Sequence, residues 1–87
     1  MLTIFVSDGI AQYLIELPLE MEDKMKDVIG PVQDQFPDEQ VVKLWHVKTG
    51  IYYNSSSKET IGNVIKKGTD FEISNDRTEQ DRQVSQN

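Results

Sequence analysis

Two runs of alternating apolar and polar residues flank Asp8-Gly9, and this pattern constrains the fold more than any other feature of the chain. Successive side chains of a strand point to opposite faces, so an alternating run is typical of a strand with one buried face. Asp-Gly between two such runs indicates a hairpin, because a type I′ turn needs positive φ at both central residues. The pattern predicts a strand over 2–7 and a return strand over 10–17 that ends at Pro18.

The spacing of the apolar residues changes after Pro18. They now recur at steps of three and four, which is typical of one face of a helix, and they are Met21, Met25, Val28, Ile29, Val32 and Phe36. Asp23 is a candidate N-cap for this helix. Pro31 lacks the N–H that would reach back to Asp27, so Gly30-Pro31 predicts a kink or an early end with a looser restart.

The rest of the chain predicts short elements and a polar tail. Strands are expected at 41–47, 51–53 and 71–73. A single helical turn is expected over 60–65. Residues 75–87 contain one apolar residue, Val84, and such a stretch cannot bury enough surface to offset its ordering entropy. The sequence therefore predicts an α+β domain over 1–74, followed by a disordered polar tail over 75–87.

The composition counts against several classes of function. The net charge is −6, and the longest basic run is Lys66-Lys67, whereas nucleic acids and anionic membranes bind clusters of Lys and Arg. The absence of cysteine removes disulfides, thiolate catalysis and the common zinc sites. No apolar run approaches the roughly 20 residues of a membrane helix, and the chain opens as a strand and not as a signal peptide. We expect a cytoplasmic protein without cofactor, nucleic-acid binding or membrane insertion.

Catalysis is not expected from this sequence either. A chain of 87 residues has one modest core and few residues to spare for an enzyme cleft. His46 is the single histidine, and no spacing specifies that Ser55 to Ser57 or a carboxylate converges on it. The acidic residues at 20–23 lack the ligand spacing of a calcium-binding loop and are explained by the positive end of a helix dipole.

The order of the elements resembles the ubiquitin-like β-grasp fold, in which a hairpin begins the sheet, a helix crosses its face and the last strand lies beside the first. The resemblance covers 2–74. It rests on the acidic start of the helix at 22–28, on Leu44 as a core leucine, and on the closing motif from Thr60 to Ile73. It implies a mixed sheet of four to five strands with one helix packed across it.

The segment YLIELPLEMEDKMKDVI, Tyr13 to Ile29, is similar to the YukD/EsaB family, which are short cytosolic ubiquitin-like components of type VII (WXG100) secretion systems without a Gly-Gly tail. This chain ends Val84-Ser85-Gln86-Asn87, so conjugation is not expected. The resemblance implies a non-catalytic adaptor for a component of the secretion apparatus. The small ubiquitin-like subunit of toluene/alkene-type diiron monooxygenases is also similar, although this chain lacks that group's Arg-rich segment after the helix.

Four residues are candidates for binding a partner protein, and they are Trp45, Lys43, Val47 and Tyr53. Leu44 is expected in the core, so strand alternation places its neighbours on the outer face of the sheet. Trp is enriched at binding hot spots because it offers a large amphipathic area. One residue of Tyr52-Tyr53 is expected to pack and the other to lie beside Trp45. The alternative is that Trp45 only covers the sheet. An exposed edge strand together with Trp45 could support a homodimer.

Overall fold

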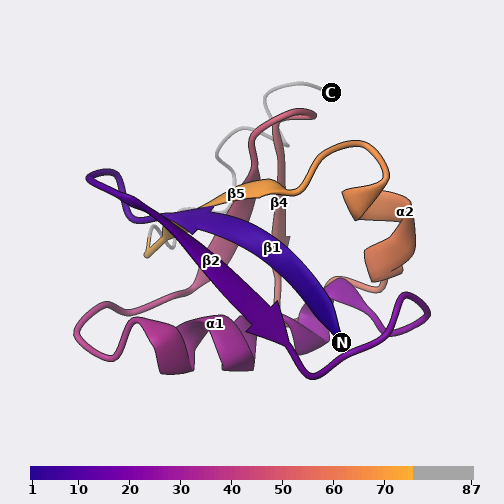
Figure 1. Cartoon of the computed structure of the whole chain (residues 1–87), viewed down its shortest axis with the longest axis horizontal. Coiled ribbons are helices and arrows are strands. Elements are labelled where there is room, and N and C mark those ends of the chain that lie inside the picture. The colour runs from indigo at the N-terminus through magenta and orange to yellow at the C-terminus, as the bar shows by residue number, and fades with distance from the viewer. Residues whose placement is uncertain (76–87) are drawn as a thin grey trace.

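Five strands form one mixed sheet in the computed structural model, which describes residues 1–75 (Figure 1). The strands are β1 (Leu2–Ser7), β2 (Gln12–Leu17), β3 (Lys43–His46), β4 (Ile51–Asn54) and β5 (Asp70–Ser74). Their order across the sheet is β2-β1-β5-β3-β4. β5 pairs in parallel with β1 and antiparallel with β3. The α+β class with a mixed sheet is confirmed. The predicted disorder over 75–87 falls, except for Asn75, outside the described residues.

The β1–β2 hairpin forms where the sequence predicts it, but its turn is not of type I′. Gly9 has φ of 93°, and no residue other than glycine has positive φ among residues 1–75. The Asp8 side chain stabilises the turn, because its Oδ1 accepts hydrogen bonds from the backbone N–H groups of Ile10 at 2.9 Å and Ala11 at 3.0 Å. These two hydrogen bonds lower the pKa of the Asp8 carboxyl, since they stabilise its charged form.

The predicted helix is divided into two pieces, and the break comes earlier than Gly30-Pro31. A 3₁₀ turn, η1 (Met25–Asp27), precedes the α-helix α1 (Ile29–Gln35). Pro31 therefore lies in the first turn of α1, where a missing N–H costs no intrahelical bond. The prediction of Asp23 as N-cap is wrong, because its carboxylate accepts the backbone N–H of Glu20 at 2.8 Å.

The start of η1 is held by the segment that leads into the second α-helix, α2 (Ile61–Ile65). Met25 donates its backbone N–H to the Glu59 carbonyl at 2.8 Å, and Ile61 donates to the Asp23 carbonyl at 2.8 Å. The predicted helical turn over 60–65 is confirmed, and Thr60 caps it by accepting the Asn63 N–H at 3.4 Å.

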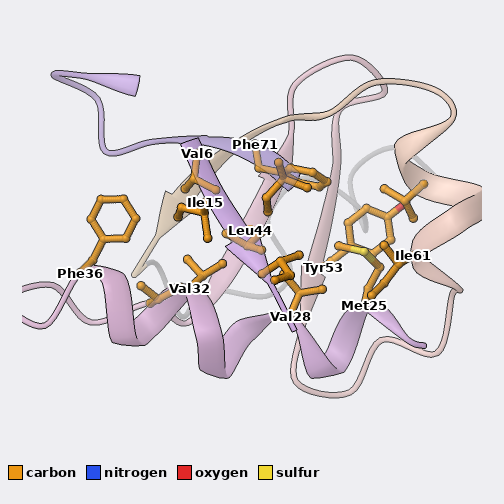
Figure 2. Close-up of a cluster of buried hydrophobic side chains, with 14 residues drawn as sticks. Val6, Ile15, Met25, Val28, Val32, Phe36, Leu44, Tyr53, Ile61 and Phe71 are labelled. Carbon is orange, nitrogen blue, oxygen red and sulfur yellow. The ribbon is translucent and has the colours of Figure 1, made fainter. Parts of the chain in front are cut away.

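The hydrophobic core lies between α1 and one face of the sheet (Figure 2). Helix residues at steps of three and four meet the alternate residues of the strands, as the two periodicities require. The buried apolar side chains are Ile4, Val6, Ile15, Leu17, Met25, Val28, Val32, Phe36, Val41, Leu44, Tyr53, Ile61, Val64 and Phe71. Neither described helix has the length and apolarity that a membrane crossing requires.

Candidate partner-binding face

An aromatic pair lies on the sheet face opposite α1. Trp45 of β3 stands directly across from Tyr52 of β4, and their ring centroids are 4.7 Å apart at an interplanar angle of 54°. Both side chains are partly exposed. Because Leu44 and Tyr53 point into the core, alternation along β3 and β4 directs Trp45 and Tyr52 outward.

Lys43 completes this group, although it does not present its charge to solvent as the sequence suggests. The residue is 1% exposed, and its Nζ lies 4.2 Å from the centroid of the Tyr52 ring. An ammonium over an aromatic face is attracted by the ring quadrupole. Lys43 therefore supports the aromatic pair from below the surface, and we refer to Lys43, Trp45 and Tyr52 as the Trp45 cluster.

One of the two adjacent tyrosines is buried and the other lies beside Trp45, as predicted, but the residue beside Trp45 is Tyr52 and not Tyr53. Tyr53 belongs to the core, and burial raises the pKa of its phenol above the ordinary value of 10.0 because the charged form is desolvated. A core residue offers little surface to a partner.

Val47, the fourth predicted partner-binding residue, is 51% exposed and begins the β3–β4 turn directly after His46.

Gly50 lies close to the indole of Trp45 at the end of the β3–β4 turn. Its φ is +74°, and a Cβ built on it would lie 3.3 Å from Cη2 of Trp45. The Gly50 N–H donates to the His46 carbonyl at 2.8 Å. A side chain at this position would therefore meet both backbone strain and the ring of Trp45.

His46 has structural contacts on the opposite side of β3. The imidazole is fully buried and lies 5.0 Å from the Phe71 ring, centroid to centroid. Nε2 lies 2.7 Å from the Gly68 carbonyl oxygen and Nδ1 lies 2.7 Å from the Thr49 hydroxyl. Because a carbonyl only accepts, Nε2 carries the hydrogen, and in the neutral ring Nδ1 accepts from Thr49. Both nitrogens are thus engaged in joining the β3–β4 turn to the α2–β5 loop.

Tyr52 and Gly50 lie against Trp45 at the candidate face, whereas the sequence analysis named Tyr53 in place of Tyr52 and did not name Gly50. The signal for Tyr52 was the length of the turn, because a turn over 47–50 sets Trp45 opposite Tyr52 and not opposite Tyr53. Within residues 1–75 the surface holds no pocket, so the Trp45 cluster offers an open face to a ligand. Such a face suits the packing of another protein's side chains.

Comparisons with known proteins give no relative from which a function could be transferred. No family model, no curated protein and no solved structure matches the chain.

Proposed function

We propose that this chain is a ubiquitin-like β-grasp adaptor that binds a protein partner through the Trp45 cluster. The partner under this proposal is a cytosolic component of a type VII (WXG100) secretion system. The observation that carries the proposal is the Trp45–Tyr52 pair, held at 4.7 Å on the sheet face opposite α1. A rigid aromatic pair loses little side-chain entropy on binding, which is why such residues recur at interface hot spots.

The arrangement of the strands supports the β-grasp part of the proposal. An N-terminal hairpin is followed by a helix across one face, and the last strand lies between β1 and β3. The parallel pairing of β1 with β5 sets the first and last strands of the described chain side by side at the centre of the sheet. This is the arrangement implied by the resemblance of residues 2–74 to ubiquitin-like proteins.

A pull-down from the native host with the wild type and Trp45→Ala tests the adaptor role. Truncating an aromatic anchor costs about 2 kcal/mol or more, which is roughly a 30-fold loss of affinity. Ile10→Ala is the matched control, because Ile10 is 93% exposed at the tip of the β1–β2 hairpin. Circular dichroism of both variants verifies that they remain folded.

The proposal predicts that Trp45→Ala loses the captured protein and that Ile10→Ala keeps it. Equal recovery by both variants would contradict a role for the Trp45 cluster. The identity of the captured protein tests the rest: a membrane ATPase or another secretion component supports the secretion role. Co-purification with a large iron-containing complex contradicts it and favours an accessory subunit of a monooxygenase.

A further inference from the structure

The free edge of β2 presents backbone hydrogen-bonding groups whose position follows from the hairpin. β2 ends the sheet order among the described residues. Asp8 donates its N–H to the Ala11 carbonyl at 3.2 Å, whereas Phe5 donates its N–H towards β5, to Thr69, at 2.9 Å. Because bonded and non-bonded pairs alternate in an antiparallel ladder, Phe5 and its partner Leu14 form a non-bonded pair. The N–H and C=O groups of Leu14 therefore point away from β1.

The same alternation extends along the strand, so that Gln12, Leu14 and Glu16 all direct their backbone groups to the free edge. Natural edge strands are usually protected by lysine, proline or a bulge. β2 has the sequence QYLIEL, in which Glu16 is the single charged residue. Leu14 is 62% exposed and Phe5, across from it on β1, is 38% exposed.

We propose that β2 pairs with β2 of a second copy of this chain, antiparallel, with Leu14 on the two-fold axis. In this register Leu14 meets its own counterpart, and each Gln12 meets a Glu16. The backbone N–H and C=O groups of Gln12, Leu14 and Glu16 in each strand then face those of the other copy, which gives about six hydrogen bonds between the copies. On the outer face, the Phe5–Leu14 pairs of the two copies join into one apolar row.

Charge and hydrogen bonding select this register over its neighbours. Placing Glu16 on the axis would set two carboxylates opposite each other, which is destabilising. If Tyr13 or Ile15 lay on the axis, one of the three residues whose backbone groups point to the free edge would, in each strand, have no such residue opposite it. With Leu14 on the axis, no like charges stand opposite each other, because each Glu16 meets a Gln12, whose amide Nε2 donates to Oδ1 of Asp70 in its own chain.

The dimer is expected to be weak and to depend on salt. The contact is smaller than the roughly 1,600 Å² of a standard interface, so we expect a dissociation constant on the order of 100 µM. Each chain carries a net charge of −6, and salt screens the repulsion between the copies. Sedimentation equilibrium across this concentration range should therefore show a mass that rises with both protein and salt concentration.

Substitutions at Gln12 and Leu14 test the register. Gln12→Lys creates opposite-charge pairs with Glu16 of the other copy and should tighten the dimer about threefold to tenfold, whereas Gln12→Glu should weaken it by a similar factor. Leu14→Lys places two like charges on the axis and should abolish the dimer, even though it lowers the net negative charge. Ser55→Lys and Ser55→Glu are the controls for net charge, since exposed Ser55 follows β4 at the opposite edge of the sheet.

The monomer must remain folded in each variant, because Gln12 Nε2 also lies 3.3 Å from Oδ1 of Asp70 in the same chain. Thermal melts followed by circular dichroism verify this. A mass that stays monomeric at all concentrations would overturn the proposal, as would a dimer that responds to Gln12 and Ser55 substitutions alike. Trp45→Ala should leave the dimer intact, so failure of the dimer and failure of the adaptor role are distinguishable.

Discussion

Replacing Gly50 by alanine should destabilise the protein through two separate effects. At a φ of +74° an L-residue costs about 1–2 kcal/mol relative to ordinary backbone, and reduced entropy of the unfolded chain returns about 0.4–1 kcal/mol of this. The added Cβ would also lie 3.3 Å from Cη2 of Trp45. Because the indole packs on Tyr52, moving it costs about 0.5–1.5 kcal/mol as a strained rotamer.

Gly9→Ala is the matched control for this substitution. Gly9 also has positive φ, at +93°, but a Cβ there would meet nothing within 4 Å. We expect Gly9→Ala to lower the free energy of unfolding by about 0.5–1 kcal/mol and Gly50→Ala by about 1–2.5 kcal/mol. The difference between the two variants is the contribution of the contact with Trp45.

Urea unfolding followed by tryptophan fluorescence measures the loss of unfolding free energy in each variant, since the emission comes from the one Trp of the chain. The two midpoints give the free energies if the slopes agree with the wild type. The emission of the folded state should change in Gly50→Ala and stay constant in Gly9→Ala. Equal losses of stability with unchanged emission in both variants would show that the ring of Trp45 does not lie over the turn.

Three further predictions concern the core and the titratable groups. Leu44→Ala should lower the free energy of unfolding by about 2–5 kcal/mol in urea titrations, because Leu44 is fully buried. The raised pKa of Tyr53 means that its stabilising contribution is complete below pH 10.0 and is lost as the pH rises through the folded-state pKa; alkaline titration of Tyr53→Phe should show a smaller loss of stability than the wild type. The lowered pKa of Asp8 gives the opposite pH dependence: its stabilising contribution is present above pH 3.8 and is lost as the pH falls below that value. Asp8→Asn keeps an acceptor for the N–H groups of Ile10 and Ala11 and should reduce the acid dependence seen in melts below pH 3.8.

Local patterns predicted much of the fold because local physics decides those elements. The alternation over 2–7 and the Asp-Gly turn were sufficient for the hairpin, and Thr60 before an apolar run was sufficient for α2. The core position of Leu44 was expected from the resemblance to ubiquitin-like proteins, and Leu44 is fully buried. For the hairpin and α2, the deciding contacts lie within a few residues along the chain.

Where distant segments decide, the sequence predicted less. The predicted helix is divided at Val28, and the N–H groups of Met25 and Lys26 at its start donate to Glu59 and Ser57, residues that no local pattern connects to them. Lys43 is buried although lysine is normally exposed, and its Nζ lies over the Tyr52 ring of the neighbouring strand. The choice between Tyr52 and Tyr53 depended on the pairing register of β3 and β4, which the turn length fixes.

The two proposed surfaces lie at opposite edges of the sheet, and this has a consequence for how the adaptor would bind. The Trp45 cluster lies on β3 and β4, whereas the proposed dimer contact is β2. A two-fold axis through an antiparallel strand pair stands perpendicular to the sheet, so both Trp45 clusters would face the same side and both α1 helices the other. Such a dimer could engage two copies of a partner at once, and the second contact would benefit from a raised effective concentration. Gln12→Glu should then weaken binding to a surface that carries many partner copies while leaving binding to a single soluble partner unchanged, because it removes bivalency and not the Trp45 cluster.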